Sequence, residues 1–478
     1  MKFTLSEKIT KCDLLLIPLY AGKNGSDFVK ENSPSDFEGK PNEKILMYQK
    51  DKIAPRILLI GLGKEKEENL EQWRQAGALV AKEIKKNIRQ LCLLPPKEEV
   101  ESIAAFLEGL RLAHDQYEAF ISKEDRKLSP IESIQVVMED RTKHKAMGEK
   151  WNEIFVITEA VKQVRHKVNA PSNAMSPSLM AKAAQKIAKQ SRRISCTVIG
   201  EKKLTKMGMG CLVGVGKGAY EETQMIVLEY KNKPTNKKPI VLIGKGICFD
   251  SGGINLKTRD LVQMKYDMTG AAIILGIFDI LSKLDLPLHV VGLAPCAENL
   301  IGERATKPGD ILTAYDGTTV EVTNTDAEGR LILCDAISYA LKQYKPEVIV
   351  DVATLTGGAI VALGHDISAL LSNNEPLAQR IKQAATATQE KIWELPLEPE
   401  YKKALESTVA DVRNFSEEAS ASTIMGALFL NHFVKDTPWV HIDMGGTGWI
   451  NNPKSYYPKG ASGRMVRTFW EFLKAYNK

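Results

Sequence analysis

Two short segments of the sequence hold most of the side chains that could do chemistry together. The first runs from Lys245 to Lys257 and contains Asp250, and Asp267 follows ten residues after Lys257. The second contains Asp326, Glu328 and Arg330. Four carboxylates brought together without counter-charge would repel one another, and some would have to stay protonated. Two divalent cations would neutralise all four, and shared carboxylates could hold the cations ~3.5–4 Å apart. The residue types therefore predict a carboxylate-dominated site for two metal ions.

The kind of metal site is narrowed by the other residues present. Oxygen-rich ligation suits Mg, Mn or Zn better than copper or an iron–sulfur cluster. None of the seven histidines lies in either segment, which excludes the His-Glu-x-x-His helix of many metalloproteases. A lysine binds a metal only as the neutral amine, so one of Lys245 and Lys257 could be a ligand while the other keeps its charge to stabilise an oxyanion. Arg330, planar and always charged, suits a small anion or a carboxylate.

These segments must be positioned by a sheet and the helices around it. Residues 239–244 and 348–352 are short, continuously apolar runs, typical of strands that are buried on both faces. They predict a mostly parallel sheet covered by helices on both sides, and ligands of such sheets bind at the carboxyl ends of the strands. Residues 320–322 alternate as a strand does. If residues 326–330 are also extended, Asp326, Glu328 and Arg330 point to one face.

The pattern of the first part of the chain predicts a separate α/β unit, in which no group of candidate catalytic residues stands out. Its strand-like and helical patterns fall at residues 14–19, 57–61 and 134–138, and at 67–85 and 98–114, respectively. A further helical pattern covers 145–167 and stops before Pro171, which disfavours helical geometry at Ala170. We therefore predict an α/β protein of two domains: a smaller N-terminal α/β domain (1–144), a linker helix (145–170) and a larger C-terminal catalytic domain (171–478).

Composition excludes several classes of protein. With 44% hydrophobic and 26% charged residues over 478 positions, the chain is neither disordered, nor collagen-like, nor a disulfide scaffold. A net charge of +6 on so long a chain does not favour a nucleic-acid partner. No run approaches the ~18 apolar residues of a membrane helix, and the first residues lack the apolar core of a signal peptide. Seven cysteines without a CxxC pattern favour the reducing cytoplasm.

The second segment also carries a resemblance to a known family. Asn324-Thr325-Asp326-Ala327-Glu328-Gly329-Arg330-Leu331 resembles the signature of the leucyl (cytosol) aminopeptidases, which are dinuclear metallopeptidases. The similarity covers roughly the last 310 residues, and it includes the stretches 168–171, 245–253, 264–268, 308–310, 353–357 and 441–444. The N-terminal part is similar only in size and in its α/β pattern.

The resemblance implies a role for each site residue. One metal ion would be held by Asp250, Asp326 and Glu328, with the backbone carbonyl of Asp326 as a further ligand. The tighter ion would be held by Lys245, Asp250, Asp267 and Glu328, so that Asp250 and Glu328 bridge the two. Lys257 and Arg330 match the two catalytic positions, and the substrate pocket is matched by Met264, Thr354 and Leu355.

The resemblance also implies an activity and its partners. The expected activity is the release of N-terminal amino acids from peptides, by attack of a water molecule activated by two metal ions on the first peptide bond. The expected cofactors are two Mn²⁺ or Zn²⁺ ions per subunit, with a bicarbonate ion at Arg330. The expected substrates are peptides with a free N-terminus, and the expected assembly is a cytosolic homohexamer that contacts neither a membrane nor nucleic acid.

One feature departs from the family pattern. Relatives commonly have a proline directly after the catalytic lysine, whereas here Thr258 follows Lys257, and the loop 258–263 before Met264 is one residue shorter. Because this loop abuts the substrate, the side-chain specificity of the family does not carry over directly.

Other interpretations of the sequence remain open. A dinuclear phosphoesterase would use a similar pair of carboxylate-held metals, and some relatives also act as DNA-binding regulators. The glycine run 214–218 resembles half of a nucleotide loop, but a structural turn is favoured because the P-loop lysine and hydroxyl are missing. His441 and Asp443 could form a base and its orienting acid, although a core or turn role is favoured. Cys248 is interpreted as a core thiol.

Overall fold

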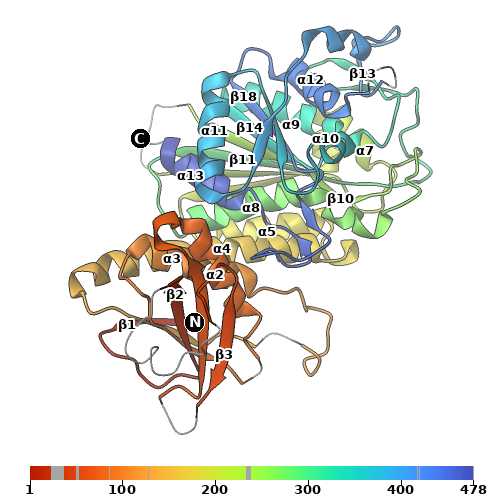
Figure 1. Ribbon diagram of the computed structural model, residues 1–478. Coiled ribbons are helices and arrows are strands. Elements are labelled where there is room, and N and C mark those ends of the chain that lie inside the picture. The colour runs from red at the N-terminus through yellow and green to blue at the C-terminus, as the bar shows by residue number, and fades with distance from the viewer. Residues whose placement is uncertain are drawn as a thin grey trace. The chain divides into compact units, whose positions relative to one another are not determined.

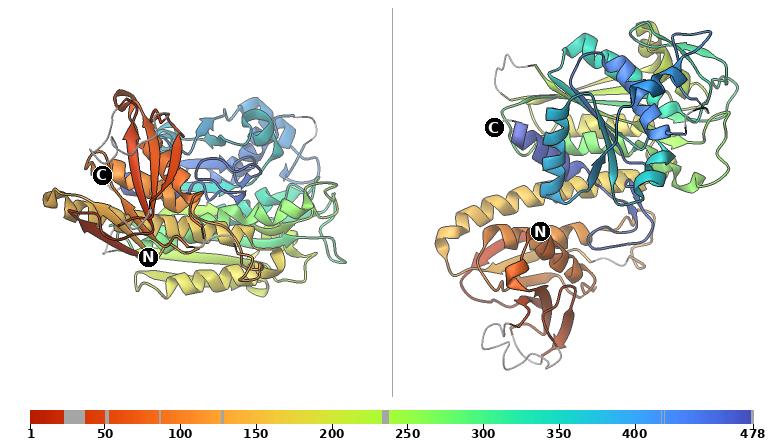
Figure 2. Two further views of the ribbon diagram at one scale, coloured as in Figure 1. Left: turned by 60° about the horizontal axis from the view of Figure 1, so that its bottom comes forward. Right: turned by 45° about the horizontal axis from the view of Figure 1, so that its top comes forward.

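The computed structural model describes residues 1–22, 37–49, 53–85, 87–126, 129–232, 238–416, 418 and 420–476 (Figure 1). The chain divides into two compact units. Unit 1 comprises Met1–Lys162 and Asn452–Lys459, and unit 2 comprises Gln163–Asn451 and Gly460–Lys478. The division falls inside α4 (His144–Asn169), which Figure 2 shows as one uninterrupted helix. The predicted domain boundaries at residues 144 and 170 stay a prediction.

Unit 1 is built on a six-stranded sheet, and α2, α3 and the first part of α4 contribute to the core on one of its faces. The strand order is β1-β6-β5-β2-β4-β3. Alternate residues of β2 serve two cores: Leu14 and Leu16 pack with α2 and α3, while Leu15 and Ile17 belong to the core on the other face. Asn69 is the N-cap residue of α2, and its side chain forms a capping box with Gln72. The elements are β1 (Lys2–Ser6), β2 (Leu14–Tyr20), β3 (Lys44–Tyr48), β4 (Arg56–Gly63), β5 (Gln90–Leu93), β6 (Ser133–Val137), α2 (Leu70–Ala81) and α3 (Val100–Ala113).

Unit 2 is built on a nine-stranded mixed sheet. Its order is β16-β15-β18-β14-β9-β11-β8-β7, with β10 paired to β11. The central strands β18, β14, β9 and β11 are parallel, as expected for a mostly parallel sheet, while β15, β8 and β7 add antiparallel pairs toward the edges. The strands are β7 (Ile194–Gly200), β8 (Gln224–Lys231), β9 (Ile240–Gly244), β10 (Gly246–Asp250), β11 (His289–Asn299), β14 (Val348–Ala353), β15 (Ser368–Ser372), β16 (Ile392–Glu394) and β18 (Trp439–Asp443).

Helices cover both faces of this sheet. Figure 1 shows α5 and α8 on one side and α7, α9 and α12 on the other. Every residue of β9 and β14 is buried, which explains their continuously apolar sequences. The helices are α5 (Pro177–Ala188), α6 (Glu201–Met207), α7 (Gly210–Gly216), α8 (Thr269–Leu281), α9 (Glu328–Tyr344), α10 (Gly357–Leu363), α11 (Glu375–Thr388), α12 (Ser422–Val434) and α13 (Val466–Tyr476).

The remaining elements are short. A small sheet joins β12 (Ile311–Thr313), β13 (Thr319–Glu321) and β17 (Val412–Arg413), and β19 (Trp449–Ile450) pairs with β20 (Gly460–Ala461). The 3₁₀ helices are η1 (Glu65–Glu67), η2 (Arg141–Lys143), η3 (Ser172–Ala174), η4 (Leu261–Met268) and η5 (Pro399–Leu405).

The structure corrects one local expectation and meets another only in part. Residues 326–330 are not extended, because α9 begins at Glu328, so Asp326 lies in the preceding turn and Arg330 in the first helical turn. In the glycine run 214–218, residues 217–218 form the turn that was favoured, but Gly214 and Gly216 belong to the end of α7. A side chain on Gly214 would crowd Leu312, and one on Gly216 would overlap Thr223. The small residues allow close packing here, which overrides their low helix propensity.

Gly270 allows α8 to approach the end of β9, where the first segment begins. A Cβ atom on Gly270 would overlap the carbonyl oxygen of Val352 and lie 2.6 Å from the backbone nitrogen of Lys245. Both neighbours are backbone atoms, one in the central strand β14 and one directly after β9, so neither can rotate away. We expect Gly270→Ala to lower the free energy of unfolding by about 1–3 kcal/mol through overpacking, measured by urea denaturation. Gly148→Ala in α4, where the Cβ position is open, should not lower it.

Candidate metal centre and active site

The four predicted acids come from elements that end at one edge of the unit 2 sheet. Asp250 is the last residue of β10, Asp267 lies in η4, Asp326 lies in the turn before α9, and Glu328 is the first residue of α9. One carboxylate oxygen each of Asp250, Asp326 and Glu328 lies within 4.8 Å of the others. Asp250, Asp267 and Glu328 are at most 3% exposed. The structure thus gathers the acids at the carboxyl ends of the parallel strands.

Two lysines each join a pair of these acids. Lys245, just after β9, places its Nζ 2.8 Å from Asp267 Oδ2 and 2.9 Å from Glu328 Oε1. Lys257, in the loop after β10, places its Nζ 2.8 Å from Asp250 Oδ2 and also forms an ion pair with Asp326. Each of the four acids therefore meets one ammonium group, and each ammonium group is shared by two acids.

The balance of charge in this cluster still favours additional cations. Burial, followed by the Asp250 and Glu328 carboxylates, raises the pKa of Asp267 despite Lys245. Burial together with Asp250 also raises the pKa values of Asp326 and Glu328. The pKa of Lys245 is raised, because the Asp267 and Glu328 carboxylates outweigh the opposing effect of burial. The cluster therefore holds its protons tightly, as expected where negative charge is in excess.

The donor atoms fit divalent cations. Glu328 Oε2 is buried without a hydrogen-bond partner, and Asp267 Oδ2 and Asp326 Oδ1 meet only lysine ammonium groups. Buried carboxylate oxygens are normally satisfied by hydrogen bonds or by metal ions. Oxygens converging from three carboxylates, with an amine beside them, form a donor set that suits Mn²⁺ or Zn²⁺. The assignment of individual ligands to two ions stays a prediction.

Arg330 lies near this cluster, in the first turn of α9. Its side chain is buried, and Nη1 donates a hydrogen bond of 2.8 Å to the carbonyl oxygen of Asn414. Its Nε has no hydrogen-bond partner. Burial lowers the pKa of Arg330 to about 10, against the opposing influence of Glu328 and Asp443. A buried guanidinium with a free N–H group suits a small anion.

The three predicted substrate residues differ in their surroundings. Thr354, which follows β14, donates its hydroxyl to Asp267 Oδ1 at 2.6 Å, and its carbonyl accepts from Lys245 Nζ at 3.0 Å. Thr354 is therefore part of the support of the acid cluster. Leu355 is half-buried, and its backbone N–H donates to Asp443 Oδ1 at 3.0 Å. Met264 is half-buried in η4, three residues before Asp267. Their contact with a substrate stays a prediction.

The sequence interpretation missed two asparagines that hold the site together. Asn299 Nδ2 donates to Asp250 Oδ1 at 2.8 Å and to the carbonyl of Thr325 at 3.0 Å. It ends β11 directly opposite Asp250 in the ladder with β10, so its position at the end of an apolar strand was a usable signal. Asn414 holds the turn that contains Asp326, but it lies in an irregular segment after β17, where the sequence offers no pattern.

The other candidate groups have structural roles. His441 is fully buried in β18, and its Nδ1 lies 2.5 Å from Asp351 Oδ1 rather than pairing with Asp443. Asp443 instead accepts the backbone N–H groups of Leu355 and Gly445, and so holds the loop after β14. Cys248 is buried as the core thiol that the sequence predicts. All seven cysteines are free.

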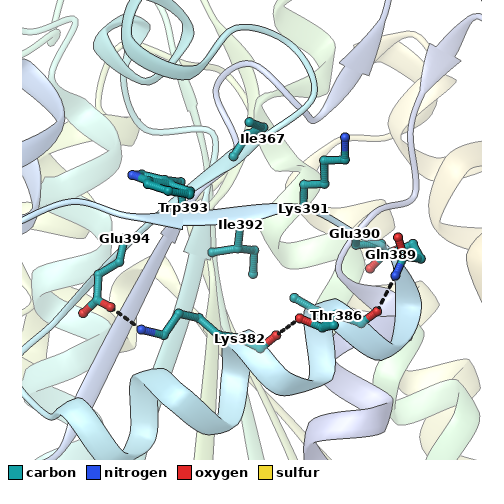
Figure 3. Close-up of a pocket in the computed structure, with 10 residues that line it drawn as sticks. Ile367, Lys382, Thr386, Gln389, Glu390, Lys391, Ile392, Trp393 and Glu394 are labelled. Atoms are coloured by element: carbon teal, nitrogen blue, oxygen red, sulfur yellow. Dashed lines mark hydrogen bonds and ion pairs between the residues drawn. The ribbon is translucent and has the colours of Figure 1, made fainter.

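A hollow lies away from the acids, between α11 and β16. Figure 3 shows Ile392, Trp393 and Ile367 around it, with Lys382 paired to Glu394 at 2.6 Å. Its volume is about 630 Å³. Glu390 is a buried carboxylate beside the hollow. It already accepts hydrogen bonds from α13 and from the residue that directly precedes α13. None of the predicted site residues lines this hollow, so it does not compete with the acid cluster as the catalytic site.

Comparison with known proteins finds similarity over nearly the whole chain. The model of the catalytic domain of the cytosol aminopeptidase family matches residues 162–470, and that of the family's N-terminal domain matches residues 30–124. A probable cytosol aminopeptidase of Desulfotalea psychrophila is 38% identical over 97% of this chain and 96% of its own length. One of Protochlamydia amoebophila is 36% identical over 99% of both chains.

Solved structures are similar as well. The bottromycin maturation enzyme BotP in complex with Mn superposes with a TM-score of 0.87 at 30% identity, covering 98% of this chain and 100% of that one. A mutant of tomato leucine aminopeptidase gives a TM-score of 0.87 at 29% identity, covering 99% and 96%. No helix in the described ranges has the length and apolar character needed to cross a bilayer. The chain belongs to the cytosol aminopeptidase family and is a hydrolase of the metallo-aminopeptidase class.

Proposed function

We propose that this protein releases N-terminal amino acids from peptides as a leucyl-type aminopeptidase with two divalent metal ions. The observation that carries the proposal is the cluster of Asp250, Asp267, Asp326 and Glu328, with buried oxygens that lack hydrogen-bond partners, in a chain of this family. Asp250, Asp326 and Glu328 would hold one ion. Asp250, Asp267 and Glu328 would hold the other together with Lys245, whose proton the ion would displace. Bound there, Mn²⁺ or Zn²⁺ would supply Lewis-acid polarisation and water activation.

The two lysines differ in the access that they offer to a substrate. The side chain of Lys257 is 20% exposed, whereas that of Lys245 is 3% exposed. Lys257 is therefore the ammonium group that a peptide carbonyl can approach, and its pKa is raised by Asp250 and Glu328 against the effect of burial, so it stays charged. A fixed positive charge stabilises the negative charge that develops on the carbonyl oxygen during hydrolysis.

Arg330 would bind a small anion and would not contact the peptide directly. Its free Nε and its burial support a site for bicarbonate, the size and charge of which match one guanidinium face. The peptide substrates, a homohexameric assembly and a cytoplasmic location are further parts of the proposal. They are supported by the family membership, and the free cysteines agree with a reducing compartment. The proposal does not include a nucleic-acid partner.

The competing phosphoesterase hypothesis predicts a different substrate. We expect the purified protein with added Mn²⁺ to hydrolyse leucine p-nitroanilide and to leave p-nitrophenyl phosphate intact. The p-nitroaniline and p-nitrophenol released are measured by absorbance, with the metal-stripped protein as control. Cleavage of the phosphate ester alone would overturn the proposed function and favour the phosphoesterase.

A further inference from the structure

Asn414 lies outside both chemistry-bearing segments, yet it contacts the second one at several points. It follows β17 and is completely buried. Its Oδ1 accepts the backbone N–H of Thr323 at 2.9 Å and that of Asn324 at 3.3 Å. Its Nδ2 donates to the carbonyls of Asn324 at 2.7 Å and Ala327 at 3.2 Å. Both ends of the carboxamide are thus used, so the side chain fits in only one orientation.

Asn414 shares the support of this turn with Asn324, whose Oδ1 accepts the N–H of Asp326 at 2.8 Å, and with Asn299, which donates to the carbonyl of Thr325. Strand β13 ends at Glu321, and α9 begins at Glu328 with Ala327 as its N-cap residue, whose side chain can form no cap hydrogen bond. Backbone groups between a strand and an uncapped helix need partners from elsewhere. Asn414 supplies them along the residues that lead to Asp326 and Glu328.

The backbone of Asn414 extends the same support to Arg330. Its N–H donates to the carbonyl of Glu321 at 2.9 Å, which fixes residue 414 to the end of β13. Its carbonyl accepts the 2.8 Å hydrogen bond from Arg330 Nη1. One residue therefore contacts both the turn that carries two acids of the cluster and the guanidinium beside it.

We propose that Asn414 is a positioning residue of the active site. Its carboxamide sets Asp326 and Glu328 at the separation from Asp250 that metal binding needs, and its carbonyl fixes the direction of Arg330. The effect on turnover rests on the proposed function, whereas the effect on metal affinity rests only on the acid cluster. Partners of this kind around metal ligands typically change metal affinity or activity by ~10–100-fold when they are replaced.

The test is Asn414→Asp in the full chain. This substitution keeps the size of the side chain and an acceptor for Thr323 and Asn324, but it places a carboxylate oxygen against the carbonyls of Asn324 and Ala327. Mn²⁺ affinity of the metal-stripped protein is measured by isothermal titration calorimetry, and kcat by cleavage of leucine p-nitroanilide. We expect ~10–100-fold weaker Mn²⁺ binding and a loss of kcat of similar size. Added negative charge alone would strengthen Mn²⁺ binding. Weaker Mn²⁺ binding would therefore show that the acids have lost their position.

Asn373→Asp is the control, which makes the same chemical change at an exposed asparagine. Asn373 also bridges two backbone groups, donating Nδ2 to the carbonyl of Thr437 at 3.0 Å and accepting the N–H of Trp439 at 2.8 Å. It follows β15 at the amino end of β18, on the sheet edge opposite to the acid cluster. This variant should lose some thermal stability but keep the Mn²⁺ affinity and kcat of the wild type.

Asn414→Ala, which adds no charge, is measured in parallel, and the melting temperature of each metal-stripped variant shows whether it is folded. A folded Asn414 variant with the Mn²⁺ affinity of Asn373→Asp would overturn the inference. Failure of both Asn414 variants to fold would overturn it too, because Asn414 would then serve the fold alone. If the wild type cleaves no amide while Mn²⁺ binding weakens in Asn414→Asp, the proposed function fails and the positioning of the acids stands.

Discussion

Lys257→Ala is expected to retain the metal content of the wild type while kcat falls roughly 10²–10³-fold, the usual cost of removing one group that stabilises a developing oxyanion. Lys257 forms ion pairs with Asp250 and Asp326 but is not one of the predicted ligands. Its removal takes a positive charge away from the acids, so metal binding should be kept or strengthened. Steady-state kinetics with leucine p-nitroanilide and elemental analysis of the same preparation measure the two quantities.

The control for this variant is another lysine that is paired with a carboxylate. Lys382 lies 2.6 Å from Glu394, away from the acid cluster (Figure 3). Lys382→Ala should keep kcat close to that of the wild type. A Lys257→Ala enzyme with unchanged kcat would remove Lys257 from the mechanism, and one that has lost its metal would make Lys257 a support of the metal site.

Asp250→Ala should lose metal and activity together, and it has the largest expected effect. Asp250 is one of the two predicted bridging ligands, and Asn299 Nδ2 and the N–H of Gly252 hold its Oδ1, so that Oδ2 faces the cluster. Replacing a supporting partner typically costs ~10–100-fold, so loss of the ligand itself should weaken Mn²⁺ binding by more than ~100-fold. Titration calorimetry and elemental analysis measure the binding, and the amidase assay measures the activity.

Asp335→Asn separates the loss of a ligand from the loss of any buried aspartate. Asp335 is fully buried in α9 and accepts the N–H groups of Leu212 and Tyr315, each at 2.7 Å, outside the acid cluster. This variant should be less stable in urea but keep its Mn²⁺ affinity. Stoichiometric, tight Mn²⁺ binding by folded Asp250→Ala would remove Asp250 from the metal site.

The main elements near the site could be predicted from local sequence patterns. The apolar runs predict β9 and β14, because a strand that is buried on both faces has apolar residues at nearly every position. In unit 1 the predicted strands coincide with β2, β4 and β6, whereas β1, β3 and β5, of four or five residues each, were missed. β6 is also five residues long but has four buried residues, whereas β1 and β3 have none and β5 has only four residues in all, so the apolar pattern that marks a strand is weaker in the missed ones.

The local form of the second segment could not be predicted. Its acidic residues are spaced by two, which suits an extended chain, yet α9 begins at Glu328. The helix prevails because its first residues pack into unit 2, with Glu328, Gly329 and Arg330 all buried there. Tertiary packing overrides a local period of this length, since three residues carry little intrinsic preference.

The sequence by itself determined which groups are candidates for the site: four carboxylates, two lysines and an arginine, and the need of such a set for added positive charge. Only the tertiary structure decided how they are shared, with Lys245 between Asp267 and Glu328 and Lys257 between Asp250 and Asp326. It also brought in Asn299 and Asn414 from other parts of the chain. The physical reason is that charge and ligand type belong to single residues, whereas distances depend on how strands and loops far apart in sequence pack together.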